Sequence, residues 1–144
     1  MNQSTPDEVE RFLEQYGWTY RPHGRGVWMS GWASDLRSYP LKIIWDESFV
    51  ELAIQPFYKL DFDWEAYPDI STWLLELSDN YKMIKVSIDQ VGDLVLSLVM
   101  INHNLDYIRF STGLGILGYY ADIIYDEISE ALDQSAFESK IPIS

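Results

Sequence analysis

The sequence predicts an α+β domain in which helices pack on an antiparallel sheet. Segments with the alternation of β-strands follow one another across short turns, which is typical of antiparallel hairpins. Segments with helical periodicity precede, interrupt and end this series. The chain has 144 residues, 47% of them hydrophobic, which is enough for one domain with one core. The expected order is one helix, three or four strands, a helix, two strands and a helix.

The first helix has the clearest local signals. Thr5 is a typical N-cap, Pro6 suits the first helical position, and Glu8 completes a capping box. Apolar residues follow at helical spacing as far as Tyr16, and Gly17 suits a left-handed C-terminal cap.

Strands are expected next, at 18–21 and 27–32 as a hairpin around a turn with two glycines. After a polar connection that contains Pro40, two more are expected at 41–45 and 49–57, with Pro56 closing the second.

In the second half, apolar spacing predicts a helix around 70–77 and a hairpin of 83–88 with 94–101. The second strand of this hairpin is apolar on both faces, which predicts cover on both sides. A last helix is expected from about 112 to 133, with an apolar stripe and an acidic one.

Residues 5–133 are expected to form a single domain, with residues 1–4 and 134–144 as tails. No apolar run approaches the length of a membrane span, and the opening MNQSTPDEVE has neither the basic nor the apolar part of a signal peptide. The chain has no cysteine, so it has no disulfide and no thiolate metal site. We therefore expect a cytoplasmic protein.

The net charge of −13 is unevenly placed. Residues 43–144 carry five basic and eighteen acidic side chains, and the stretches 60–81 and 110–139 have no Lys or Arg. Such a surface repels phosphate, so neither nucleic acid nor an anionic membrane is an expected partner. The charge either serves solubility or meets a basic partner.

Two sequence motifs resemble a cofactor-binding site and a metal-binding site, but neither has the residues around it that such a site needs. Gly113–Gly118 matches GxGxxG, but too little chain follows it for the strand that completes a dinucleotide-binding unit. Asp61–Glu65 resembles the start of a calcium loop, but Ala66 stands where the loop needs glycine and Thr72 where it needs glutamate. We expect no cofactor and no metal.

No set of residues predicts catalysis. His23 and His103 are the only imidazoles, and neither has a partner at ligand spacing. The acidic stripe Asp122, Asp126 and Glu130 is typical of a solvated helix face. We expect that the protein is not an enzyme.

The aromatic residues leave two interpretations open. Trp28, Trp32, Trp45 and Trp64 are either core residues or a partner- or ligand-binding surface.

The segment 70–132 resembles the YbjN-like proteins, a family of candidate bacterial sensory transduction regulators. The resemblance rests on the helix core Trp73-Leu74-Leu75-Glu76-Leu77, the strand 82–88, the turn Gly92-Asp93, the apolar strand 94–100 and a helix ending Ile128-Ser129-Glu130-Ala131-Leu132. It implies a fold like that of type III secretion chaperones, which are small, acidic, cytoplasmic and usually dimeric. It implies no catalytic residues.

Together these features favour a non-enzymatic protein-binding module, chaperone-like or regulatory. The alternative is a small-ligand sensor or an unrecognised enzyme with an aromatic-lined pocket. A homodimer is also expected, because the second apolar face of strand 94–101 needs a cover that a second copy can supply. Its candidate contacts are Val95, Val99 and Ile101.

Overall fold

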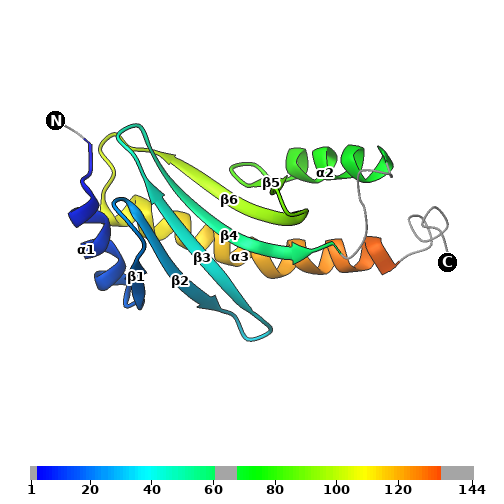
Figure 1. Cartoon of the computed structure of the whole chain (residues 1–144), viewed down its shortest axis with the longest axis horizontal. Coiled ribbons are helices and arrows are strands. Elements are labelled where there is room, and N and C mark those ends of the chain that lie inside the picture. Colours follow the sequence, from blue (N-terminus) through cyan, green and yellow to red (C-terminus); the bar gives the residue numbers. More distant parts are fainter. Residues whose placement is uncertain (1–2, 61–67, 134–144) are drawn as a thin grey trace.

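The computed structural model describes residues 3–60 and 68–133, which form one six-stranded sheet and three helices (Figure 1). In chain order the elements are α1 (Pro6–Tyr16), β1 (Tyr20–Pro22), β2 (Val27–Ala33), β3 (Ser38–Trp45), β4 (Phe49–Lys59), α2 (Pro68–Asn80), β5 (Lys85–Ile88), β6 (Asp93–Ile101) and α3 (Tyr107–Asp133). The α+β class and the order of elements are confirmed, with four strands between the first two helices.

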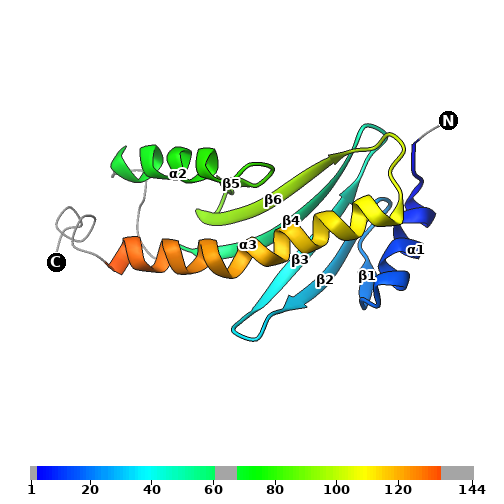
Figure 2. The ribbon, with the colours of Figure 1, turned by 180° about the vertical axis from the view of Figure 1, so that it is seen from behind.

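The strand order in the sheet is β1-β2-β3-β4-β6-β5, and every neighbouring pair is antiparallel. The long helix α3 crosses one face of this sheet, as the view from behind shows (Figure 2). The opposite face, turned toward the viewer in Figure 1, has no described helix across it. We call it the open face.

The hydrophobic core lies between α3 and the sheet. Its fully buried residues come from α1, from the helix-facing sides of the central strands and from one stripe of α3, and include Leu13, Trp28, Leu41, Ile43, Leu52, Leu94, Leu96, Leu98, Phe110 and Leu117. Because β4 and β6 lie side by side beneath α3, residues far apart in the sequence meet there.

The start of α1 confirms the predicted capping box. The Glu8 backbone N–H donates to Thr5 Oγ1 at 3.2 Å, and the Thr5 N–H donates to Glu8 Oε1 at 3.2 Å. The helix ends at Gly17, whose φ of 88° is the expected left-handed cap.

Ser4, which the sequence analysis assigned to the N-terminal tail, packs into the domain. It is 4% exposed, and its backbone N–H and hydroxyl both donate to Asn102 Oδ1, at 2.8 and 2.7 Å. The Trp45 indole N–H donates to the Ser4 carbonyl at 3.0 Å. These bonds fix the chain one residue before the N-cap of α1. The predicted tail 134–144 lies outside the described residues.

Two proline positions differ from the expectation. β3 begins at Ser38 and includes Pro40, which lies opposite Gly31 of β2, whereas pairing with β4 begins only at Leu41. At Pro40 the edge of β3 that faces β4 is therefore unpaired, so the missing N–H of proline removes no hydrogen bond to β4. β4 continues beyond Pro56, and its register with β6 shifts between Ile54 and Tyr58. The proline interrupts the pairing without ending the strand.

α3 begins at Tyr107, earlier than the expected start near 112. The Asp106 carboxylate accepts a hydrogen bond from the Arg109 backbone N–H at 2.9 Å, which caps the first turn. The glycines of the GxGxxG motif therefore lie inside the helix, more than a turn after its start.

β6 is covered on both faces only in its first part. Leu94, Leu96, Leu98 and Met100 are buried beneath α3, as expected. On the open face, Val95 and Ser97 are buried, but Val99 is 45% exposed and Ile101 63% exposed. The cause is the length of β5, which pairs with β6 only as far as Lys85 opposite Ser97. Beyond that point no described strand flanks β6 on this side.

Candidate functional site

The end of β5 leaves one edge of β6 unpaired. Just before β5 the chain makes a turn off the sheet. Met83 has a φ of 71°, and the Ile84 N–H donates to the Tyr81 carbonyl at 3.3 Å within this turn. Within the part of the chain that the structure describes, Leu98–Ile101 has no strand beside it on this edge. An unpaired edge presents N–H and C=O groups to which another extended segment can bond.

A groove of about 360 Å³ runs along this edge, between β6 and the first turns of α3. We call it the edge groove. It is lined by Met83, Leu98, Val99, Met100, Ile101, Ile108, Arg109, Thr112, Gly113 and Ile116. Two large apolar side chains are exposed beside the unpaired edge, Met83 (64%) and Ile108 (72%), and the adjoining Val99 (45%) and Ile101 (63%) are exposed on the open face. Exposed apolar side chains that gather in one place are typical of a binding surface.

Three basic residues lie at or next to the edge groove, in a half of the chain that is mostly acidic. Of the five basic residues in 43–144, Arg109 lines the groove, Lys82 adjoins its wall at Met83, and Lys85 ends the paired part of β5. The Arg109 guanidinium donates to the His103 carbonyl at 3.0 Å, which holds it beside the groove. An acidic side chain is therefore favoured here.

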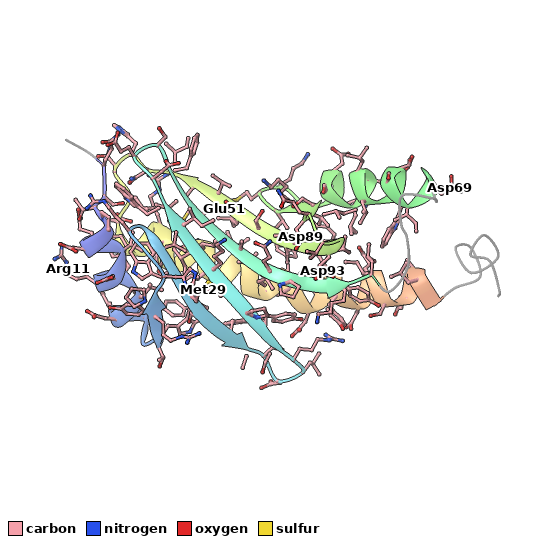
Figure 3. All side chains as sticks on the ribbon, in the orientation of Figure 1. Arg11, Met29, Glu51, Asp69, Asp89 and Asp93 are labelled. Carbon is pink, nitrogen blue, oxygen red and sulfur yellow. The ribbon has the colours of Figure 1, made fainter. Side chains whose placement is uncertain are left out.

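The open face of the sheet carries a second apolar patch. Phe49 of β4 lies opposite Ile101, and Glu51 lies opposite Val99. Phe49 is 48% exposed. Figure 3 shows Glu51 and Met29 on this face. The predicted dimer contacts therefore divide: Val99 and Ile101 are accessible, whereas Val95 is 8% exposed and offers little contact area.

The tryptophans do not form one surface. Trp28 is 1% exposed, and its indole N–H donates to Glu10 Oε2 at 2.7 Å, so it is a core residue. Trp45 is partly buried and anchors Ser4. Trp64 lies outside the described residues. Of the three described candidates, Trp32 lines a pocket.

Trp32 lies at a hollow of about 500 Å³ where the end of α1, the β2–β3 turn and the middle of α3 meet. We call it the Trp32 hollow. Its lining is Tyr16, Trp32, Ala33, Ser34, Asp35, Leu36, Leu114, Gly115, Gly118, Tyr119 and Asp122. Leu36 and Tyr119 are each 68% exposed. Trp32 stacks on Tyr39 with ring centroids 5.4 Å apart, which fixes the indole.

Two residues of the predicted acidic stripe form an ion-pair network with Arg37, which directly precedes β3. Arg37 Nη1 and Nη2 lie 3.3 Å from Asp122 and 2.6 Å from Asp126, and the guanidinium lies 4.0 Å from the centre of the Tyr125 ring. Tyr39 donates a hydrogen bond to Asp122. This network joins α3 to the sheet, so these two residues are not simply a solvated face.

Burial alone would raise the pKa of Asp122, but hydrogen bonds from Ser34, Tyr39 and Arg37 outweigh it and hold the pKa below its usual range. Burial and the bond to Asp122 raise the pKa of Tyr39. The carboxylate is therefore ionised and the phenol protonated at neutral pH. A permanently charged carboxylate suits a structural ion pair and is a poor general acid.

The glycine motif has a packing role at two of its positions. A Cβ at Gly113 would lie 2.9 Å from Met100 Sδ, and one at Gly118 would lie 2.7 Å from Trp32 Cζ2. At Gly115 a Cβ would meet no atom within 4 Å. Gly113 and Gly118 thus let α3 approach the sheet, and the absence of a side chain at Gly115 helps to open the Trp32 hollow.

Among residues 3–60 and 68–133, no group of three His, Asp or Glu side chains could hold a metal ion. None of the described helices is both long enough and apolar enough to span a membrane. The calcium-loop resemblance at 61–65 lies outside the described residues.

Sequence reasoning missed Met83, Ile108 and Ile116 as residues of the edge groove. Ile108 and Ile116 are apolar residues of α3 that lie outside its buried stripe. An apolar residue outside the stripe was the sequence feature that could have indicated a binding surface. Leu36 and Tyr119 of the Trp32 hollow had no comparable signal, because their surroundings come from distant segments.

Comparison with known proteins shows the fold. No family model and no curated protein sequence matches the chain. YbjN from E. coli, described as a candidate transcription regulator, matches with a TM-score of 0.63 at 10% identity, over 87% of this chain and 92% of that chain. SycH, a Yersinia pestis type III secretion chaperone solved in complex with a stable fragment of YscM2, matches with a TM-score of 0.52 at 13% identity, over 83% and 98%. The predicted resemblance to the YbjN-like and chaperone-like fold is confirmed.

Proposed function

We propose that this chain is a non-enzymatic, cytoplasmic protein-binding module, chaperone-like or regulatory. The observation that carries the proposal is the unpaired edge of β6 beside an exposed apolar groove. Both structural neighbours support it, because one is described as a candidate regulator and the other was solved with a bound protein fragment.

The proposed occupant of the edge groove is an extended segment of a partner protein. It would pair its backbone with Leu98–Ile101 and place alternate apolar side chains over Ile108 and Ile116. It would also carry an acidic residue, because Arg109, Lys82 and Lys85 lie at or beside the groove. A second copy fits this groove less well, since a two-fold axis there would bring the same cations together.

The test is affinity capture with the wild-type protein and two matched variants. Ile108→Asp places a charge in the groove, and Leu75→Asp makes the same change at a residue of α2 that is 73% exposed and does not line the groove. A partner captured by the wild type and by Leu75→Asp, but lost with Ile108→Asp, would support the proposal. Recovery of no such partner, or of the chain alone, would contradict it.

The partner's binding segment then tests the pairing itself. N-methylation of its backbone amides, one at a time, should weaken binding at every second position, because only alternate N–H groups face β6. Equal sensitivity at all positions would contradict strand pairing.

We also propose that the chain forms a homodimer through the open face, at Val99, Ile101 and Phe49. Glu51 lies on this face beside Val99, and Lys42 lies opposite Ala53 in the next row, so the two charges can pair across a two-fold axis. Light scattering after gel filtration should give twice 16.8 kDa, and Phe49→Asp should return the mass to that of one chain. Phe49 does not line the edge groove, so this variant should still bind the partner. A single-chain mass for the wild type at all concentrations would contradict the dimer.

A small-ligand sensor is a second candidate function. The observation that favours it is the Trp32 hollow, which has aromatic walls and lies apart from the edge groove.

A further inference from the structure

We propose that the Trp32 hollow binds an organic cation, either a guanidinium or an alkylammonium group. This inference rests on the second candidate function and is independent of partner binding at the edge groove. It names the class of ligand from the chemistry of the walls.

The walls combine aromatic rings with carboxylates. Tyr16, Trp32 and Tyr119 supply aromatic surface from α1, β2 and α3, Asp35 supplies an exposed carboxylate, and Asp122, which is bonded to Arg37 and Tyr39, lies in the wall. Aromatic rings attract cations through their electron-rich faces, and a nearby carboxylate adds Coulomb attraction. The same pair of features disfavours an anion.

The residues that line the hollow include no lysine or arginine. The nearest cation in the described network is Arg37, which is held by Asp122 and Asp126 and covered on one side by Tyr125. Asp35 is exposed on the β2–β3 turn. The three carboxylates outnumber the one guanidinium, so the local charge at the hollow is negative.

The shape of the hollow is fixed by packing rather than by a loop alone. Trp32 stacks on Tyr39 and lies close to Gly118, where a Cβ would be 2.7 Å from the indole Cζ2. The space beside it is kept open by Gly115, where a Cβ would meet no atom within 4 Å. A pocket formed in advance loses little entropy when it binds a ligand.

The probes are agmatine, as a free guanidinium compound, and the peptide acetyl-Ser-Gly-Arg-Gly-Ser-amide, as a side chain presented by a protein. The matched peptide with citrulline in place of arginine has nearly the same shape and no charge. Binding is followed through the Trp32 indole N–H resonance of ¹⁵N-labelled protein, assigned with Trp32→Phe.

We expect the arginine peptide or agmatine to shift this resonance and to bind about tenfold more tightly than the citrulline peptide. Tighter binding of the peptide identifies a protein side chain as the ligand, and tighter binding of agmatine identifies a free small molecule. If the citrulline peptide binds as tightly as the arginine peptide, the hollow is a ligand site but the cation inference is wrong. If no probe shifts the resonance, the cation inference is wrong, and the second candidate function is wrong as well only if neutral and anionic metabolites also leave the resonance unshifted.

Three variants test the site itself. Asp35→Asn should weaken binding several-fold, whereas Asp79→Asn, the same change at an exposed residue of α2, should not. Gly115→Leu should abolish binding by filling the hollow. The protein should stay folded, because leucine has a higher helix propensity than glycine and a Cβ at this position meets no atom within 4 Å. Equal losses with Asp35→Asn and Asp79→Asn would show attraction to the net charge alone and would overturn the proposal.

Discussion

Gly118 of α3 lies directly against the indole of Trp32 in β2, so closely that a Cβ at position 118 would be 2.7 Å from Cζ2. This contact fixes the distance between the long helix and the β2 side of the sheet. Three residues earlier, Gly115 has open space at the corresponding position. Two glycines of one helix thus have opposite surroundings, which allows a paired test.

We expect Gly118→Ala to destabilise the protein and Gly115→Ala to stabilise it. Alanine is a better helix former than glycine by about 0.5–1 kcal/mol, and at Gly115 nothing opposes that gain. At Gly118 the new methyl group must displace an indole that is already stacked on Tyr39. The free-energy cost of this displacement should exceed the gain in helix propensity. Urea unfolding of both variants measures the difference. Equal stabilisation by both alanines would show that α3 is not closely packed on Trp32.

The glycines also show what the sequence could and could not reveal. The sequence shows these glycines as the pattern GxGxxG, and the structure places close contacts at Gly113 and Gly118. Their partners could not be predicted, because Met100 and Trp32 belong to strands at different places in the sheet. The start of α3 was also missed, since no strong N-cap signal other than Asp106 marks it and three glycines weaken the helical pattern.

Asn102 should be the most sensitive polar position described here. It is 2% exposed, accepts two hydrogen bonds from Ser4 and donates to the Asp46 carbonyl at 3.0 Å. Asn102→Ala leaves buried polar groups of Ser4 without these bonds, which should cost about 1–3 kcal/mol of unfolding free energy. Thermal unfolding measures this loss. Asn80→Ala, at an exposed residue of α2 whose side chain makes none of the described hydrogen bonds, serves as the control and should change little.

The stability of the protein should fall in acid partly through Asp122. Its pKa is lowered in the folded state, so the stability it contributes is fully present above the unfolded pKa of about 4 and is lost as the pH falls through the lower folded value. Asp122→Asn should therefore be less stable than the wild type at pH 7, and the difference should shrink below about pH 4. Urea unfolding at a series of pH values measures this, with Asp79→Asn as the exposed control. A difference that stays constant with pH would contradict the ion-pair role.

The edge groove illustrates why a surface is harder to predict than a fold. The alternation in residues 94–101 correctly located β6 and its buried face, and it correctly indicated that the other face was apolar. How far that face is covered depends on how much of β6 is paired with β5. β5 begins only at Lys85, because the chain at Met83, with its φ of 71°, still lies off the sheet. A positive φ at a methionine is set by the surrounding structure and leaves no signal in a hydrophobic pattern.

The last prediction concerns Ser97, which should be a site where a substitution stabilises the protein. Its side chain is fully buried on the open-face side of β6, between Ala53 of β4 and Lys85 of β5, and its hydroxyl has no hydrogen-bond partner among the described residues. A buried hydroxyl without a partner loses its bonds to water on folding, so Ser97→Ala should raise the unfolding free energy by about 1 kcal/mol.

Ser78 is the matched control for this prediction. Its hydroxyl accepts a hydrogen bond from the Val86 N–H at 3.1 Å and donates one to the Val86 carbonyl at 3.2 Å, which joins α2 to β5. Ser78→Ala should therefore lower the unfolding free energy by about 1 kcal/mol, the opposite sign to Ser97→Ala. Urea unfolding of the two variants under the same conditions decides the matter. If Ser97→Ala is also destabilising, the hydroxyl has a partner in solution, and the open face beside β6 is then more polar than the contacts of the described residues indicate.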